Sequence, residues 1–243
     1  MKSALSRPFI QLTVLCVIFF LTNVATVYFL DVQNNRLVRI VTTLLLFIFF
    51  ILKKGYTRGF LFLAFICLVT RDILVLDYEA PLNKTTTFVL TIIAYIVLAY
   101  SNIKKLKFSR STPLILLLAL ALISLNAFNV YYLSDVIKQG LSNNVQYILF
   151  FAQGAIIILL GFVGFMYNDR YEGKTPLIFL YMVLCFILAD LCGLAAYFFD
   201  LKIAYFPERI FYLLALTLLI NYMLNRNIEV AKGFKEQEKG LII

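Results

Sequence analysis

Two aspartates of this 243-residue chain stand inside long apolar runs, where charged side chains are rare. Asp72 is the fourteenth residue of the run 59–76, and Asp190 is the fifteenth residue of the run 176–199. At about 1.5 Å per helical residue, each aspartate would lie roughly 20 Å from the start of its run. A buried Asp at such depth costs about 2.5–3.5 kcal/mol on insertion scales, so both residues are candidates for function.

Two carboxyl groups at matching depth suit acid–base catalysis. Burial disfavours the charged form of a carboxylic acid, and a second carboxylate nearby separates the two titrations. One aspartate can then stay protonated as a general acid, while the other, ionised, steadies a cation or deprotonates water. The same pair also suits a membrane carrier that binds or relays protons.

Both aspartates have a structural interpretation as well. Asp72 follows Arg71, and its helix could end early and leave the carboxylate near the headgroups, paired with a lysine or with Arg71. Asp190 could pair with Arg71 or Arg209 and only hold helices together. A structural role predicts a dry neighbourhood with Arg71 fixed on an aspartate, whereas an enzyme predicts a shared hydrated pocket.

Most other catalytic groups are missing from the sequence. The chain has no histidine, which excludes Ser-His-Asp and Cys-His sites and zinc motifs of the H-E-x-x-H type. It has no glycine-rich phosphate loop, CxxC pair or Rossmann fingerprint either. The four cysteines all fall in apolar runs, where they behave as small hydrophobic residues. We therefore expect neither a metal nor a cofactor.

The elements that must position these residues are membrane helices. Hydrophobic residues make up 63% of the chain and charged residues 14%, against about half and a quarter in soluble domains. The apolar runs are continuous and do not alternate in period two, which favours helices over a barrel. Since a crossing takes about 20 residues, we predict an all-α, polytopic transmembrane helix bundle of about eight spans. The runs cover residues 9–30, 37–52, 59–76, 86–103, 113–132, 145–167, 176–199 and 204–224.

Lysine and arginine are distributed unevenly between the two sides of such a bundle. One side would carry 15 of them and the other 6, with Arg71 inside a run, which accounts for all 22. The positive-inside rule then predicts that both termini are cytoplasmic. The net charge of +9 lies in short clusters between runs, so we expect membrane lipid and not nucleic acid as the partner. One cluster, Lys104, Lys105, Lys107 and Arg110, is expected to be a topology signal that touches anionic lipid.

A single transmembrane domain is expected over residues 1–225, followed by a short basic cytoplasmic tail at 226–243. A shift of 118 residues places Cys67 on Cys185 and Asp72 on Asp190, which is compatible with a four-plus-four internal repeat. Five amides inside the runs are expected to form interhelical hydrogen bonds. They are Asn23, Asn126, Asn129, Gln153 and Asn221.

The two aspartates in their helices resemble the YhhN family, whose animal members are lysoplasmalogenases. That family has eight membrane helices, with an Asp in the third, in a pattern like F-S-x-x-G-D-x-x-L, and another in the seventh, like F-x-x-S-D-x-x-L-A. The corresponding stretches here are FICLVTRDILVL at 65–76 and FILADLCGLAA at 186–196. The resemblance implies an integral protein of the bacterial inner membrane that hydrolyses the vinyl ether of a lipid, with Asp72 and Asp190 catalytic.

The resemblance also indicates where substrate would be held and where the chain departs from the family. Asn221 corresponds to a polar amide that the family often has in its eighth helix. Arg71 stands where the family usually has Gly, and Ala189 where it often has Ser. The family's His–x–x–Tyr element in the fourth helix is reduced to Tyr100. Substrate-binding residues are therefore expected at Asn221, Arg71 and Tyr100, while a proton-coupled carrier and a non-enzymatic membrane protein remain the alternatives.

Overall fold

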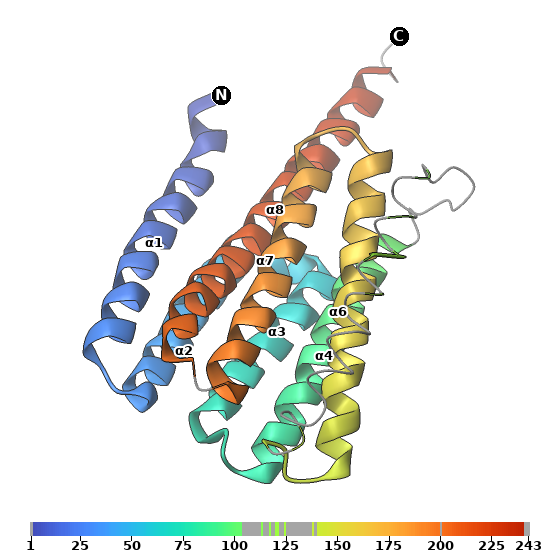
Figure 1. Ribbon diagram of the computed structural model, residues 1–243. Coiled ribbons are helices and arrows are strands. Elements are labelled where there is room, and N and C mark those ends of the chain that lie inside the picture. The colour runs from blue at the N-terminus through green and yellow to red at the C-terminus, as the bar shows by residue number, and fades with distance from the viewer. Residues whose placement is uncertain are drawn as a thin grey trace.

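The chain forms a bundle of long helices (Figure 1). The computed structural model describes residues 2–103, 140–199 and 201–240, with isolated positions between 113 and 138. The expected span at 113–132, the basic cluster at 104–110, and Asn126 and Asn129 lie outside these described ranges. The helices are α1 (Lys2–Phe29), α2 (Val32–Leu52), α3 (Gly59–Leu74), α4 (Pro81–Ile103), α6 (Asn144–Arg170), α7 (Lys174–Phe198) and α8 (Tyr205–Gly240).

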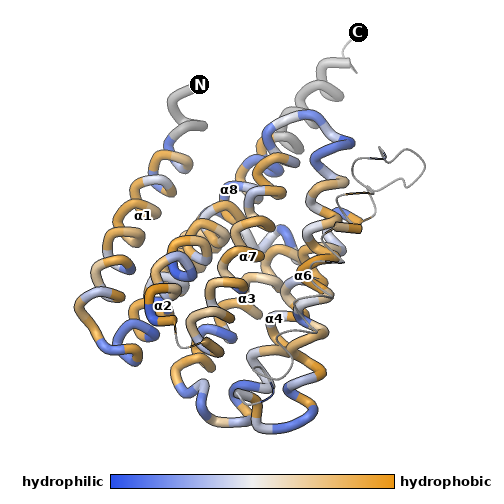
Figure 2. The backbone as a smooth tube through the Cα atoms, viewed as in Figure 1, coloured by the Kyte–Doolittle hydropathy of each residue, from blue (hydrophilic) through white to orange (hydrophobic). Residues whose placement is uncertain are grey.

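Seven helices within the described ranges are long and apolar enough to cross a membrane. Apolar residues cover their shafts and hydrophilic residues gather at the turns that join them (Figure 2). All regular structure in the described ranges is helical, including short 3₁₀ turns at Gly55–Thr57, Val75–Asp77 and Lys202–Ala204. The predicted all-α transmembrane bundle is thereby confirmed, and the chain is an integral membrane protein.

Six of the described helices form a closed ring in which α2, α3, α4, α6, α7 and α8 each contact the next and α8 returns to α2. Helix α1 lies outside the ring, against α2 and α8 (Figure 1). Helices α4 and α6 run parallel, because Gln146 Nε2 near the start of α6 donates to the Pro81 carbonyl at the start of α4, at 2.9 Å. Residues 103 and 140 therefore lie at opposite ends of the bundle, while the N- and C-terminal ends of the chain lie at the same end (Figure 1).

Helix boundaries differ most from the prediction where charged residues continue a helix. Helix α2 begins at Val32, five residues before the apolar run, and so includes Arg36 as well as Arg39 of the run. Helix α8 continues without a break to Gly240, so the tail expected from residue 226 is helical as far as the structure describes it. Hydropathy marks a boundary at the first charged residue, but Arg, Lys, Glu and Gln are good helix formers and do not end a helix.

The turn between α2 and α3 is packed closely against α2. Lys54 adopts a left-handed conformation with φ 62°, and a Cβ on the following Gly55 would overlap the ring of the fully buried Phe50. We expect Gly55→Ala to lower the free energy of unfolding by about 1–3 kcal/mol, as overpacking does elsewhere. Gly59→Ala is the matched control, since nothing lies within 4 Å of its Cβ position. Equal stability of the two variants in thermal unfolding would contradict this packing.

An exposed ion pair ties α2 to the turn that precedes α4. Arg36 donates to both carboxylate oxygens of Glu79, at 2.8 and 3.0 Å, and this contact holds the pKa of Glu79 below its ordinary value. Because the folded-state pKa is the lower one, the pair contributes stability above the ordinary value of 4.5, and the contribution is lost as the pH falls through the lowered pKa. The Glu79 side chain is 64% exposed, so the contribution is limited to about 0–1 kcal/mol.

This contact leads to a prediction about Glu79→Gln. We expect the variant to lose less than about 1 kcal/mol at pH 7 in low salt, and to unfold like the wild type at acidic pH or in about 1 M salt, where screening is strong. Thermal unfolding over a pH and salt series measures the difference. A deficit that persists in high salt would contradict an electrostatic origin.

Candidate functional site

The carboxylate of Asp72, near the end of α3, is completely enclosed. Its Oδ1 forms ion pairs with Arg39 at 2.8 Å and with Arg71 at 3.1 Å. Its Oδ2 accepts hydrogen bonds from the Tyr212 hydroxyl at 2.7 Å and from Thr43 at 2.8 Å. The side chain has no exposed area, and since it lies between two guanidinium groups, it carries its negative charge.

The ion pairs continue from Asp72 to helix α8. Arg39 also donates from Nη1 to Glu208 Oε1 at 2.9 Å, and the other oxygen of Glu208 lies 3.3 Å from Arg209 Nε. The ring of Tyr212 lies beneath two guanidinium groups, 4.2 Å from that of Arg39 and 4.6 Å from that of Arg71. Three helices thus share one ionic cluster, which consists of Arg39, Arg71, Asp72, Glu208 and Arg209.

Asp190, on α7, has a different environment. Its Oδ2 accepts hydrogen bonds from the Tyr95 hydroxyl of α4 at 3.0 Å and from Gln153 Nε2 of α6 at 2.9 Å. Both of these partners are neutral, and no guanidinium of the described residues lies within ion-pair distance of Asp190. Asp190 is thus held by neutral hydrogen-bond donors, whereas Asp72 is held by ion pairs.

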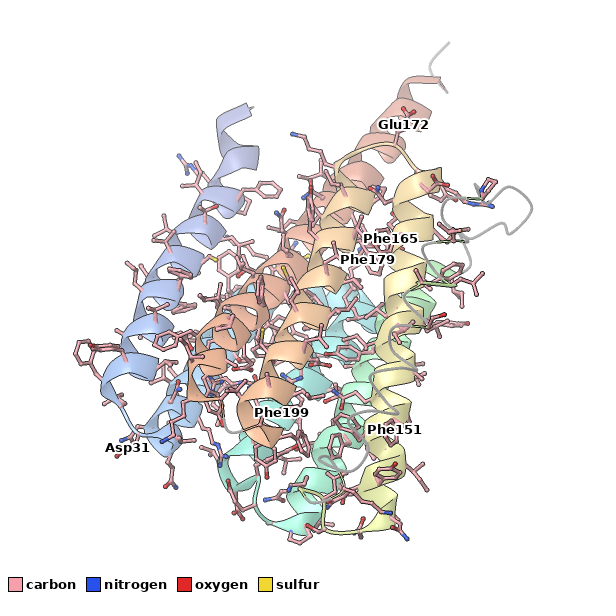
Figure 3. The ribbon with its side chains drawn as sticks, in the orientation of Figure 1. Asp31, Phe151, Phe165, Glu172, Phe179 and Phe199 are labelled. Atoms are coloured by element: carbon pink, nitrogen blue, oxygen red, sulfur yellow. The ribbon has the colours of Figure 1, made fainter. Side chains whose placement is uncertain are left out.

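A cavity of about 350 Å³ adjoins Asp190. This volume is in the usual range for small-molecule sites. Phe151 and Phe199 lie toward the end of the bundle that contains Asp31, away from Glu172, and Phe151 is part of the cavity wall (Figure 3). Polar residues of the wall include Arg36, Arg39, Arg71, Gln153, Asp190, Glu208 and Arg209, and apolar or aromatic ones include Phe88, Phe150, Ile157, Ile158, Ile187, Tyr197 and Phe198.

The expectation that both aspartates open on one hollow is wrong for Asp72, which is not among the residues that line the cavity. Its helix does not end early, because α3 continues to Leu74 and Asp72 is only 1% exposed. Arg71 is fixed on Asp72, as a structural role predicts. Asp72 was expected to pair only with Arg71 or a lysine, and the second guanidinium that closes the site, Arg39 of the run 37–52, was not predicted.

The three expected substrate-binding residues differ in their distance from the cavity. Arg71 lines the cavity, but Tyr100 and Asn221 do not. Tyr100 is 44% exposed and its ring contacts Phe60 at 5.3 Å, because five residues along a helix turn it well away from the direction of Tyr95. Asn221 follows Tyr212 by nine residues, about 13 Å further along α8 and on its opposite side.

The interhelical amides also behave differently from one another. Gln153 joins α6 to Asp190 of α7, as expected for an amide inside a run. Asn23 instead donates to the Phe19 carbonyl of its own helix at 2.8 Å. The amide of Asn225 donates to Asn221 Oδ1 at 2.7 Å, again within one helix.

Several residues of the site were not found from the sequence. Tyr95 and Tyr212 are two of fifteen tyrosines, and nothing in their neighbours separates them from the rest. Arg36, Arg39 and Thr43 do carry a signal, since spacings of three and four place them on one face of a helix. The full pattern becomes visible only once α2 is known to begin before Arg36.

Within the described ranges, no group of three or more His, Cys, Asp or Glu side chains could hold a metal ion. Comparison of the chain with family models, curated proteins and solved structures found no match. The resemblance to the YhhN family therefore stays a prediction, and the function must be argued from the geometry of the cavity.

Proposed function

We propose that this protein is a membrane-embedded hydrolase that cleaves the vinyl ether of a single-chain ether lipid or a similar amphiphile. The observation that carries the proposal is Asp190, a carboxyl group in the wall of a largely apolar cavity with neutral hydrogen-bond partners. A carboxyl group with such partners can hold a proton at neutral pH, whereas Asp72, between two guanidinium groups, stays ionised.

One carboxyl group is enough for this reaction. Asp190 transfers its proton to the β-carbon of the vinyl ether, and the carbon next to the ether oxygen becomes an oxocarbenium-like cation. Water adds to that cation and gives its proton to the Asp190 carboxylate, which restores the acid. The resulting hemiacetal collapses to an aldehyde and an alcohol, so the net reaction consumes one water and leaves Asp190 unchanged.

Asp72 has a positioning role in this proposal. Its carboxylate holds Arg39 and Arg71 in place, and both arginines line the cavity that Asp190 also lines. This role replaces the direct contact with substrate that the sequence suggested. The ionic cluster fixes one wall of the cavity so that Asp190 and the bound lipid meet in a constant geometry.

The described helices offer no specific support for a carrier. Helices α6, α7 and α8 are each continuous through the level of the cavity. Carriers commonly have helices that are broken near the middle of the membrane, where unwound backbone binds the coupling ion. The proton-coupled carrier therefore remains an alternative that rests on Asp190 alone.

For the topology we propose eight spans with both termini in the cytoplasm of a bacterial cell, and the inner membrane as location. The parallel course of α4 and α6 supports an additional crossing, because residues 103 and 140 lie at opposite ends of the bundle. The end that contains both termini also holds Arg58 and Arg226 among its described residues. Positive charge at that end is what the positive-inside rule requires of a cytoplasmic side.

Aldehyde release from purified protein tests the proposed reaction. The wild type in a neutral maltoside detergent is supplied with a lysolipid that carries a vinyl ether, and in parallel with the saturated alkyl-ether analogue of equal chain length. We expect aldehyde only from the vinyl ether, since the alkyl ether has no carbon that can accept the proton. Release of fatty acid from an ester lysolipid, without aldehyde from the vinyl ether, would refute the proposal.

A further inference from the structure

Arg209 presents unused hydrogen-bond donors inside the protein. The residue is 4% exposed, and neither Nε nor Nη1 has a hydrogen-bond partner. Glu208 lies 3.3 Å from Nε, which is close enough for attraction but lacks hydrogen-bond geometry. An unsatisfied buried donor costs about 1–3 kcal/mol, and more when the group is charged. Such a group in a native structure requires an explanation.

The position of Arg209 suggests an explanation for its unused donors, because Arg209 lines the same cavity as Asp190. Three more buried atoms of the cavity's residues have no hydrogen-bond partner: Thr87 Oγ1, Arg39 Nε and the carboxylate oxygen Glu208 Oε2. Unused guanidinium donors of both Arg39 and Arg209 therefore lie at one hollow. A ligand with several acceptor oxygens would satisfy donors that the protein itself leaves open.

Charge indicates which ligand fits. Four guanidinium groups, of Arg36, Arg39, Arg71 and Arg209, line the cavity. Three carboxylates, of Glu79, Asp72 and Glu208, form ion pairs with them. With Asp190 protonated, as the proposed function requires, the site has one positive charge in excess. A ligand with one negative charge would balance it.

We infer that Arg209 is the specificity-determining residue of the cavity and binds the phosphodiester of a single-chain lipid. This inference rests on the proposed function for the charge of Asp190, while the open donors of Arg209 support it independently. The unused donors at Nε and Nη1 can each donate a charge-assisted hydrogen bond to an anionic oxygen. The alkyl chain lies along the aromatic wall that includes Phe88, Phe150 and Phe151. In such a lipid only a glycerol unit separates the phosphate from the ether bond, so one cavity can hold both.

Equilibrium binding in maltoside detergent tests the assignment without any turnover. The probe is a radiolabelled alkyl-ether lysophospholipid, which has a phosphodiester but no cleavable vinyl ether. We expect Arg209→Gln to weaken its binding about 10- to 100-fold, or about 1.4–2.7 kcal/mol, as is typical for the loss of a hydrogen bond to a charged group. Arg226→Gln, a remote arginine of the same helix, is the control and should bind like the wild type. A monoacylglycerol of equal chain length should bind both Arg209 forms alike, since it has no phosphate.

Competition on the wild type keeps the test decisive if Arg209→Gln does not fold. The unlabelled phosphodiester lipid should displace the probe at least 10-fold better than the monoacylglycerol, and inorganic phosphate should compete only weakly because it lacks the chain. Equal displacement by the charged and the neutral lipid would overturn the inference, as would unchanged probe binding by Arg209→Gln. Stronger displacement by a fatty acid than by the phosphodiester would also overturn it. Arg209-dependent binding without aldehyde release would refute the hydrolase and leave the phosphodiester site standing.

Discussion

Asp190→Asn is expected to abolish aldehyde release while the helix bundle stays folded. The amide has the shape of the carboxyl group, and its carbonyl oxygen can accept the hydrogen bonds that Tyr95 and Gln153 now donate to Oδ2. It cannot donate a proton to carbon or take one from water, which removes general acid–base catalysis worth about 10²–10⁴-fold. Turnover of the vinyl-ether lysolipid, measured together with thermal unfolding, separates this loss from unfolding.

Asp31→Asn is the matched control for this experiment. Asp31 precedes α2 at the end of the bundle and makes no side-chain capping hydrogen bond there. The same chemical change at that position should therefore leave turnover within about twofold of the wild type. If Asp190→Asn kept its activity at that level, Asp190 would not be the acid, and the proposed mechanism would be wrong.

The bundle was predictable because each span is a local property of the sequence. A run of about 20 apolar residues cannot be placed elsewhere than in a membrane, and such a run identifies α3 or α7 without any knowledge of its neighbours. The helix boundaries were less predictable. Hydropathy depends on the side chains, whereas where a helix begins and ends depends on the backbone. The start of α2, up to Arg36, lies inside the helix although it precedes the apolar run.

Of the residues of the site, the isolated carboxyl groups were the ones that the sequence could predict. An aspartate in an apolar run is conspicuous, and Asp190 lies in the wall of the cavity. What surrounds an aspartate depends on contacts between distant parts of the chain, such as the ion pair of Arg39 with Glu208, 169 residues apart. Equal depth in the membrane suggested that Asp72 and Asp190 share one catalytic site. The two differ because arginines from α2 and α3 converge on one of them and not on the other.

Asp72→Asn is expected to have the opposite consequence to Asp190→Asn, a loss of stability. Without the carboxylate, the guanidinium groups of Arg39 and Arg71 remain buried, and Arg71 loses its ion-pair partner. Removing one member of a buried ion pair costs about 3–5 kcal/mol, because the remaining charge is left uncompensated. Chemical or thermal unfolding in detergent measures the change, and the Asp190→Asn variant should stay within about 1 kcal/mol of the wild type in the same assay.

A double variant distinguishes charge from shape as the cause. Asp72→Asn combined with Arg71→Gln removes one charge of each sign, so the amide that replaces the carboxylate faces one guanidinium and not two. If stranded charge causes the instability, the double variant should be more stable than Asp72→Asn alone, with a coupling of about 0.5–3 kcal/mol. Additive losses would mean that the Asp72 carboxylate matters through its hydrogen bonds to Tyr212 and Thr43. In that case Arg71 would owe its position in the cavity wall to Tyr212, over whose ring it lies, and not to Asp72.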